Sequence, residues 1–366
     1  MTDVRATLEK LIGPAAVLPG EPVVACPAND DEVVEAIRLA ATERWNLTPI
    51  GLGSSPRGDA DFLLSTRRIT GVVAYEPGDG TLSARAGTTI AELERVTRAG
   101  GNHLTPRVAA ADRSTLAGVL AEGRSGIDRL RYGPSRHHVL GMRVALADGS
   151  VVKCGGRLVK NVTGYDMHRL YCGSRGTLCV VLEASMRLFA SFEREVLLTA
   201  PARDRAGAIE AARAAEALGV RPLAIRAENV LDPKGAWRVH VLLAGRPELV
   251  EWGRRMLLAS WPGAAEGLES SERLRDAELA PGRWPDLRAT GRPSRLAAAL
   301  PRLPEDARMI VEPSIGLAWI FIEADARERA ANVLREAGLA DRGSAGAALS
   351  RRLKSAFDPD GILART

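Results

Sequence analysis

Aromatic residues and lysine are both scarce in this 366-residue chain, and each shortage argues against a class of function. Phe, Trp and Tyr make up 4% of the residues, too few to indicate the stacking surfaces that bind single-stranded nucleic acids. Only five of the 50 basic residues are lysines, and the basic residues are spread along the chain. The net charge of +5 therefore does not indicate a nucleic-acid surface, and we expect no nucleic-acid partner.

Cysteine is also scarce, and no Cys-x-x-Cys pair occurs among Cys26, Cys154, Cys172 and Cys179. This spacing does not indicate a zinc or iron–sulfur site within the chain, so we expect no metal. We interpret the four cysteines as free thiols of a cytoplasmic protein, because disulfides are rare in that reducing compartment.

Long apolar runs are missing as well. No stretch of about 18 apolar residues is present, so the sequence predicts no membrane span. The first twenty residues carry acidic side chains and no sustained apolar core, so we do not expect a secretory signal peptide.

What the sequence does contain is an alternation of helix and strand signals. Asn29 and Glu32 form a capping box before residues with helical apolar spacing, and Thr89 and Glu92 form a second box for a helix that Gly100 ends. Residues 71–87 read as two strands joined by a Pro-Gly-Asp-Gly turn, and residues 139–156 as a hairpin. These patterns predict an α+β fold.

The composition of the sequence changes near residue 190. From there to about residue 346, Ala- and Arg-rich helical segments alternate with strands such as RVHVLLAG. The last twenty residues predict an amphipathic helix ended by Asp-Pro-Asp-Gly. We therefore predict one domain over residues 1–190 and a smaller α+β domain over 196–345. The return of the C-terminal segment, 346–366, to the first domain is implied by the family resemblance given below.

Three glycine-containing segments stand out in the first half. In the first, GLGSSPRGD at 51–59, backbone N–H groups and serine hydroxyls have the composition to hold a phosphate, although a plain surface turn fits equally well. It is neither a Walker A loop nor a dinucleotide fingerprint. The second, STLAGVLAEGRSG at 114–126, presents small residues, which close helix–sheet packing would explain as well.

The third segment, GGRLVKNVTGYDMHRLYCGSRGTLCVV, covers residues 155–181. Thr163 and Asp166 predict a capping box for a helix that Gly173 ends, and Lys160 and Asn161 precede it. A lysine beside a helix start favours an anion, but a buried lysine paired to a carboxylate is the alternative. Together, the three segments suggest an extended ligand approached by backbone at several places, such as a dinucleotide.

The order of these segments resembles flavoproteins of the PCMH and vanillyl-alcohol-oxidase type, and among them the E-type subunits of glycolate oxidases. Five segments match in the same order: GLGSSPRG, AYEPGDGTLSARAGTTIAELERVTRAGG, the segment from Ser114 to Val144, the Lys-Asn-Val-x-Gly-Tyr-Asp string and LKSAFDPDGI. The resemblance covers the first 190 residues and the last twenty. It implies a PCMH-type FAD-binding domain made of two α/β subdomains, a reduced α+β cap and noncovalent FAD.

The resemblance assigns residues to the cofactor site. The pyrophosphate would lie at Gly51, Gly53, Ser54 and Ser55. The second half of the site would be lined by Thr115, Gly118, Gly123, Ser125, Gly126 and Gly133. Backbone would be presented by Gly173, Gly176, Thr177, Leu178 and Val180, with Lys160 and Asn161 near the flavin or the phosphates.

Three residues depart from the pattern of that family. Ala117 and Cys179 stand where glycine is usual, which narrows the site, and His137 stands where aspartate is usual. The pyrophosphate loop contains no histidine, so the resemblance does not imply a histidyl link to the flavin there.

Histidine is too scarce to offer an obvious catalytic base. Of the five histidines, only His240 falls in the predicted cap, and the histidine-rich metal motif of the catalytic flavin subunits is missing. His168 is the other candidate, although the sequence favours a histidine on a helix surface. Catalytic residues therefore stay unassigned.

The resemblance implies a function and its partners. The chain would be an FAD-binding subunit of a glycolate (2-hydroxy-acid) oxidase or dehydrogenase complex, supporting electron transfer beside a catalytic flavin subunit and an iron–sulfur subunit. It would be cytoplasmic, with peripheral membrane association only through those partners. A stand-alone FAD-dependent oxidoreductase acting on another alcohol or sugar, and a flavin-free scaffold subunit of the same complex, are the alternatives.

Overall fold

The computed structural model describes residues 3–53, 59–157, 165–261, 263–267, 270–279, 282–339 and 347–364. The chain divides into two compact units, which we describe separately. Unit 1 consists of Met1–Ser125, Pro134–Ala190 and Ala348–Thr366, and unit 2 of Gly126–Gly133 and Ser191–Ala347. That these units are a cofactor domain and a cap, with the boundaries given above, stays a prediction.

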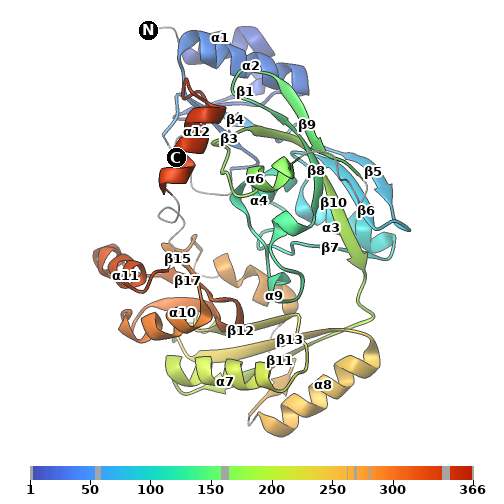
Figure 1. Cartoon of the computed structure of the whole chain (residues 1–366), viewed down its shortest axis with the longest axis vertical. Helices are drawn as coiled ribbons and strands as arrows, with labels where there is room; N and C mark the ends of the chain where they lie inside the picture. The colour runs from blue at the N-terminus through green and yellow to red at the C-terminus, as the bar shows by residue number, and fades with distance from the viewer. Residues whose placement is uncertain are drawn as a thin grey trace. The chain divides into compact units, whose positions relative to one another are not determined.

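Unit 1 begins with a small sheet covered by two helices (Figure 1). Its described strands lie in the order β1 (Val17–Leu18), β2 (Val23–Ala25), β4 (Phe62–Ser65) and β3 (Leu47–Ile50), with β2 and β3 parallel to β4. Helices α1 (Val4–Ile12) and α2 (Asp30–Glu43) share a buried apolar cluster with these strands. The predicted cap of α2 is confirmed, because the Asn29 side chain accepts a hydrogen bond from the backbone N–H of Glu32 at 2.9 Å.

The second sheet of unit 1 is antiparallel and contains both predicted hairpins. Its strands run β5 (Val72–Glu76), β6 (Thr81–Arg85), β10 (Val180–Ala190), β8 (Val139–Ala145) and β9 (Val151–Gly155), and β7 (Asn102–Leu104) also pairs with β10. Helix α3 (Ile90–Ala99) begins after Thr89 and ends at Gly100, as predicted. Helices α4 (Leu116–Glu122) and α6 (Met167–Tyr171) share the apolar cluster of this sheet.

Helix α6 differs from the sequence prediction. It spans five residues, has Asp166 at its N-cap position without a side-chain capping bond, and ends at Cys172 rather than Gly173. Thr163, the other half of the predicted capping box, lies outside the described residues. Asp166 instead pairs with Arg169, one turn along α6, at 3.1 Å, so its carboxylate contacts a side chain rather than backbone N–H groups.

Unit 2 is built on one antiparallel sheet of seven described strands. Their order is β14 (Ala265–Glu266), β11 (Arg194–Ala202), β13 (Trp237–Gly245), β12 (Ala224–Glu228), β16 (Arg308–Glu312), β17 (Leu317–Phe321) and β15 (Leu287–Thr290). A segment far away in sequence, which contains the short helix α5 (Arg129–Tyr132), also belongs to this unit. The α+β class predicted from the sequence is confirmed in both units.

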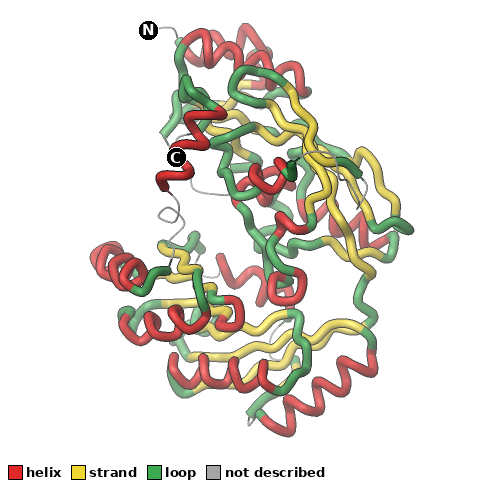
Figure 2. The backbone as a smooth tube through the Cα atoms, in the orientation of Figure 1, coloured by secondary structure: helices red, strands yellow, loops and turns green. Residues whose placement is uncertain are grey.

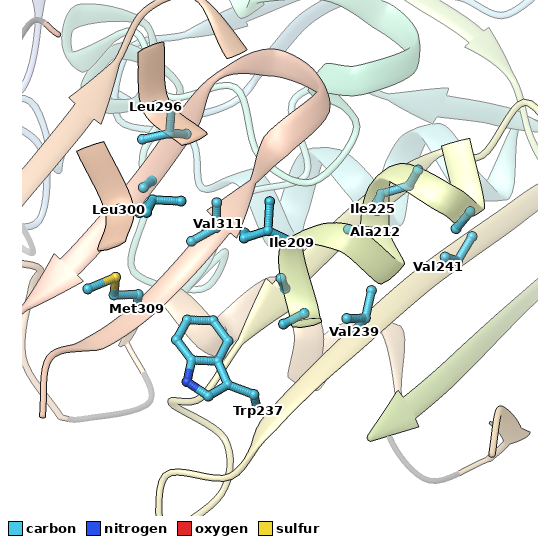
Figure 3. Packing of buried hydrophobic residues seen from close by; sticks show 14 of the residues in the cluster. Ile209, Ala212, Ile225, Trp237, Val239, Val241, Leu296, Leu300, Met309 and Val311 are labelled. Atoms are coloured by element: carbon cyan, nitrogen blue, oxygen red, sulfur yellow. The ribbon is translucent and has the colours of Figure 1, made fainter. Parts of the chain in front are cut away.

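One face of the unit 2 sheet is covered by helices (Figure 2). These are α7 (Arg205–Ala217), α8 (Pro247–Ser260), α10 (Pro293–Ala299) and α11 (Ala324–Glu336). Figure 3 shows Ile209 and Ala212 of α7 with Val239 and Val241 of β13 in their shared apolar cluster. Because strand side chains alternate between faces, His240 between the two valines points to the opposite face, on which α9 (Ser271–Asp276) packs.

The C-terminal helix α12 (Ala347–Phe357) is followed by a tail that is bound to the first sheet of unit 1. The Asn46 amide group donates to the backbone carbonyls of Gly361 (2.9 Å) and Leu363 (2.7 Å), and the N–H of Leu47 donates to Ile362 at 2.7 Å. The tail thus continues the hydrogen bonding at the start of β3, and it joins the two ends of the chain within one unit.

Asp358 organises this tail from within. Its carboxylate accepts hydrogen bonds from the N–H groups of Ile362 and Leu363, both at 2.8 Å, and pairs with Lys354. Lys354 also donates to the carbonyl of Thr177 at 3.1 Å. Because Asp358 is buried, its loss would leave two N–H groups without a partner and the Lys354 ammonium without its counter-charge.

We expect Asp358→Ala to lower the free energy of unfolding by about 3 kcal/mol, because it breaks a buried ion pair and leaves one partner behind. The measurement is denaturant unfolding of both proteins. The control is Asp360→Ala, since Asp360 is exposed two residues away and should change stability by less than about 0.5 kcal/mol. Equal effects of the two variants would contradict this account of the tail.

Candidate cofactor site

The first predicted segment leaves β3 at its C-terminal end. A β carbon on Gly51 would lie 2.2 Å from Thr115 Oγ1, so the backbone of Gly51 runs directly against the Thr115 side chain. Gly53 has a positive φ of +76°. Ser54 and Ser55 fall in 54–58, outside the described residues. The first and second glycine segments therefore meet at Gly51 and Thr115.

The second segment is helix α4 with its two ends. Thr115 precedes the helix, and its Oγ1 accepts a hydrogen bond from the N–H of Gly118 at 3.2 Å. Gly123 ends the helix in the left-handed conformation, which glycine adopts without strain. A β carbon on Gly123 would be 3.3 Å from the Cα of Gly173, so the second and third segments meet with bare backbone against bare backbone.

The third segment is held to the other two along its length. The N–H of Gly173 donates to Leu120 at 2.9 Å, and that of Arg175 donates to Ala121 at 2.8 Å. Gly176, with φ of +75°, lies against Pro49 of β3, 2.9 Å from where its β carbon would be. Three contacts thus join all three predicted segments within unit 1: Gly51 with Thr115, Gly123 with Gly173, and Gly176 with Pro49.

The residues after Gly176 lie deeper in unit 1. Thr177 Oγ1 donates to the carbonyl of Ser174 at 2.7 Å, while its own carbonyl accepts from Lys354. The side chains of Leu178 and Val180 are buried in apolar clusters. Val180 also pairs with Ala145 of β8, so the sheet surrounds its backbone.

Three further predicted residues lie where the chain passes between its units. Ser125 belongs to unit 1, where its hydroxyl accepts from the N–H of Ser135 at 3.2 Å. Gly126 and Gly133 are the first and last residues of the segment that belongs to unit 2. Within unit 2, Arg131 binds that segment to the carbonyl of Ala244 at 2.7 Å. The structure therefore does not group Gly126 and Gly133 with the other predicted residues in unit 1; Lys160 and Asn161 fall in 158–164, outside the described residues.

Comparison with known proteins identifies this part of the chain. The FAD binding domain family matches residues 22–155, which include the first two glycine segments. The chain carries an FAD binding domain. FAD is therefore the cofactor that this match indicates.

The relatives of the FAD binding domain are oxidoreductases by name. The chain is 29% identical over 182 residues to the glycolate oxidase subunit GlcD of Bacillus subtilis, which covers 48% of this chain and 39% of that protein. It is 30% identical over 184 residues to a D-lactate dehydrogenase of Archaeoglobus fulgidus, with 49% and 41% covered. A D-2-hydroxyglutarate dehydrogenase of Xanthomonas citri pv. viticola is 30% identical over 175 residues, with 46% and 37% covered. The matches thus span about two fifths of these relatives.

Solved structures extend the likeness to the whole fold. p-Cresol methylhydroxylase with bound substrate superposes with a TM-score of 0.75 at 13% identity, covering 98% of this chain and 94% of that one. An alkyldihydroxyacetonephosphate synthase superposes with a TM-score of 0.72 at 18% identity, covering 93% and 76%. At such identities the likeness shows the fold alone, which is the PCMH-type fold that the sequence resemblance implied.

The described residues fit an FAD cofactor in two respects. At each of the three segment contacts a glycine brings its backbone directly against the neighbouring segment, which suits a cofactor held largely by peptide groups. Two buried polar atoms on the same elements, Thr48 Oγ1 on β3 and Glu122 Oε2 at the end of α4, have no hydrogen-bond partner among the described residues. Buried polar atoms are normally satisfied by protein, water or ligand, so these two atoms are compatible with a polar ligand on these elements. FAD itself supplies the redox chemistry, and the chain supplies its binding and orientation.

His168 corrects the interpretation of a helix-surface histidine. Its side chain is buried, with 4% exposed, and its Nδ1 has no partner among the described residues. Burial lowers the pKa of His168, with Asp166 opposing the shift, so the imidazole is neutral at neutral pH. Sequence reasoning missed this burial because α6 is too short to show an amphipathic period. His137, by contrast, is exposed, and desolvation and two neighbouring arginines lower its pKa.

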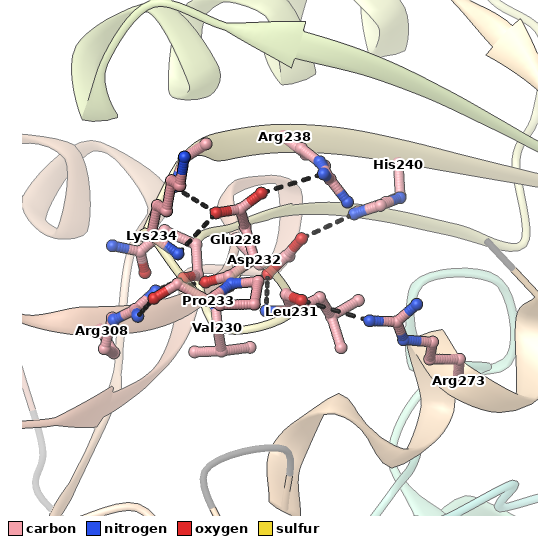
Figure 4. A network of polar contacts seen from close by, with 12 residues as sticks. Glu228, Val230, Leu231, Asp232, Pro233, Lys234, Arg238, His240, Arg273 and Arg308 are labelled. Atoms are coloured by element: carbon pink, nitrogen blue, oxygen red, sulfur yellow. Dashed lines mark hydrogen bonds and ion pairs between the residues drawn. The ribbon is translucent and has the colours of Figure 1, made fainter. Parts of the chain in front are cut away.

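His240 is fixed inside unit 2 (Figure 4). Its Nε2 lies 2.9 Å from Glu228 Oε1, and its Nδ1 lies 2.9 Å from Thr199 Oγ1. The other oxygen of Glu228 accepts from the N–H groups of Val230 and Leu231 at 2.7 and 2.8 Å. Because both ring nitrogens already have partners, His240 would have to break a buried hydrogen bond before it could take a proton from a substrate.

Arg226 lies beside His240 in the same row of the sheet. Its guanidinium donates to Glu312 Oε1 at 2.6 Å and to the carbonyl of Leu274 at 2.8 Å, and lies 3.4 Å from Glu278. Burial raises the pKa of Glu312, although Arg226 opposes the shift. Thr199, His240, Arg226 and Glu312 thus form a buried polar row across four strands, in which each side chain has a partner.

Gly51 offers a direct test of the cofactor site. We expect Gly51→Ala to raise the dissociation constant for FAD at least about tenfold, because its methyl group would overlap Thr115 Oγ1 and push the two segments apart. The measurement is an FAD titration followed by flavin fluorescence. The matched control is Gly78→Ala, an exposed turn position where a β carbon would meet nothing within 4 Å. An unchanged dissociation constant for FAD in Gly51→Ala would show that FAD binding does not depend on the contact between Gly51 and Thr115.

The cysteines give a second test, which bears on whether FAD is bound covalently. Burial raises the pKa of Cys172 to about 12 and also raises the pKa values of Cys26, Cys154 and Cys179. We therefore expect no fast reaction of the native protein with a thiol reagent at pH 8, and four reactive thiols after denaturation, since the thiolate is the nucleophile. Rapid labelling of native Cys154 or Cys172 would contradict this assignment.

The same shift predicts a dependence of stability on pH. Between the ordinary thiol pKa of 9.0 and about 12, Cys172 keeps its proton in the folded chain and loses it in the unfolded chain. Stability therefore falls as pH rises through this window, by about 1.4 kcal/mol per pH unit for this thiol alone. Replacing Cys172 with serine removes that slope, which denaturant unfolding between pH 8.5 and pH 10.5 measures.

Proposed function

We propose that this chain is an FAD-binding subunit of a 2-hydroxy-acid oxidase or dehydrogenase complex of the glycolate oxidase type, and that it holds FAD noncovalently. The observation that carries the proposal is the meeting of the three glycine segments, the first two of which lie within the residues that match the FAD binding domain family. The reaction class comes from the relatives, named as a glycolate oxidase subunit and as D-lactate and D-2-hydroxyglutarate dehydrogenases. Their common substrate class is a small 2-hydroxy acid, with the D configuration where it is chiral.

The proposed cofactor contacts follow the sequence assignment. Among the described residues of unit 1, we place seven around FAD: Gly51, Gly53, Thr115, Gly118, Gly123, Gly173 and Gly176. We keep four more described residues of unit 1 in the proposed site: Ser125, Thr177, Leu178 and Val180. We keep Ser54, Ser55, Lys160, Asn161, Gly126 and Gly133 in the proposal on the family resemblance.

We place substrate oxidation mainly on a partner flavin subunit, with an iron–sulfur subunit as the electron carrier. Two features support this division of roles: His240 has a partner at both ring nitrogens, and His168 is buried with a lowered pKa. In the described residues, no helix has both the length and the apolar character needed to cross a bilayer. We propose a cytoplasmic complex that reaches a membrane surface only through its partners.

The visible spectrum of the purified chain, before and after acid precipitation, tests the cofactor part. Flavin absorption that moves into the supernatant is the expected result, because no covalent link holds FAD. Colour that stays in the pellet would contradict noncovalent binding. A protein that stays colourless after incubation with excess FAD would favour the flavin-free scaffold.

Turnover tests the division of roles. We expect the isolated chain, loaded with FAD, to reduce an artificial electron acceptor with glycolate or D-lactate at less than about a hundredth of the rate of the assembled complex, since it lacks a positioned base. Full turnover by the isolated chain on these acids, or on a panel of other alcohols and sugars, would favour the stand-alone oxidoreductase. The control is the same assay with the L enantiomer of lactate.

A further inference from the structure

Helix α8 of unit 2 is apolar on two sides. Val250, Gly253 and Leu257 are buried against the sheet, and the backbone at Gly253 approaches so closely that a β carbon would be 3.2 Å from Leu243. The outward side carries large apolar groups that are exposed: Leu249 by 66%, Trp252 by 43% and Met256 by 37%. Residues spaced by three and four lie on one side of a helix, so these three form a continuous stripe.

The charges beside the stripe divide into two groups. Glu251 and Arg254 are neutralised within the chain: they pair with each other at 3.2 Å, and Arg254 also pairs with Glu266 at 2.8 Å. Glu248 and Arg255 are both exposed, and the described part of the chain offers neither of them an ion pair. The stripe thus has an unpaired acid near the N-terminal end of α8 and an unpaired base near its C-terminal end.

We propose that the exposed side of α8 is the interface of a homodimer, in which α8 of a second copy packs against it antiparallel across a two-fold axis at Trp252. In such a pair Leu249 lies opposite Met256 of the other copy, because the midpoint of these two positions falls about half a residue from Trp252. Glu248 lies opposite Arg255 of the other copy for the same reason. One arrangement therefore covers the whole stripe and neutralises both charges.

The arrangement selects a second copy of this chain as the occupant. A two-fold interface must be complementary to itself, and here the acid lies four residues before the central tryptophan and the base three residues after it, so the two charges are nearly symmetric about it. A parallel pair would bring like charges to the same level along the two helices, so that Glu248 would not lie opposite Arg255 of the other copy. The stripe, the two charges and their spacing all belong to α8, so the inference depends on unit 2 alone and not on the proposed cofactor chemistry.

The size of the patch sets the expected strength. A helix of 14 residues is about 21 Å long, so two such helices bury less than a standard protein interface. We expect a reversible dimer with a dissociation constant in the range of about 10–100 µM. Sedimentation velocity of the full chain, from about 1 to about 200 µM and with a reductant present, covers this range.

Charge reversal provides the decisive experiment. Glu248→Arg or Arg255→Glu alone creates two like-charge pairs per dimer, and we expect each to raise the dissociation constant at least about tenfold at low salt. The double variant E248R/R255E recreates both pairs with their signs exchanged, and we expect it to restore the constant to within about threefold. Trp252→Asp, at the axis, should leave no measurable dimer.

The matched control uses α11, which has the same pair of exposed charges seven residues apart. Glu328→Arg and Arg335→Glu should leave the dissociation constant unchanged. A chain that stays monomeric at every concentration would overturn the proposal and assign the stripe to a different protein. A dimer that ignores all α8 variants, or one that the double variant fails to restore, would overturn it as well.

Discussion

Unit 1 of this protein depends on backbone that approaches other segments more closely than a side chain would allow. At Gly51, Gly123 and Gly176 a single β carbon would press against a neighbouring segment. Such contacts draw β3, α4 and the turn before β10 together although about 125 residues separate the first from the last. Peptide groups at the surface of such a cluster have fixed positions and directions, which is what a cofactor held by backbone requires.

Unit 2 depends on buried polar side chains rather than on close backbone contacts. Its sheet carries the buried row of Thr199, His240, Arg226 and Glu312, where an apolar core would ordinarily continue. A shift of any one of these strands by one residue would move its member of the row to the wrong face and leave the neighbouring buried polar groups without a partner. The row therefore specifies the register of four strands. Apolar side chains of similar shape would specify that register less sharply, because they can exchange places at lower cost.

Local signals carried most of what the sequence could predict. The capping boxes at Asn29 and Thr89 and the Pro-Gly-Asp-Gly turn act within a few residues, so their helices and hairpin could be placed. The ion pair between Arg226 and Glu312 joins residues 86 positions apart, and no local pattern indicates it. The passage of residues 126–133 into unit 2 was missed for the same reason, since its anchor is the long-range bond from Arg131 to Ala244. The burial of His168 required knowing what packs on α6.

The tail that ends on β3 has a consequence for how the chain is made. Asn46 and Leu47 leave the ribosome early, but their partners at Gly361 to Leu363 are synthesised only after the whole of unit 2. The nascent chain therefore has to carry an unfinished unit 1, with the donors of Asn46 unpaired, while unit 2 is complete enough to fold by itself. Translation order would make the second unit the first to mature, and unit 1 would close last, when Asp358 brings the tail into place.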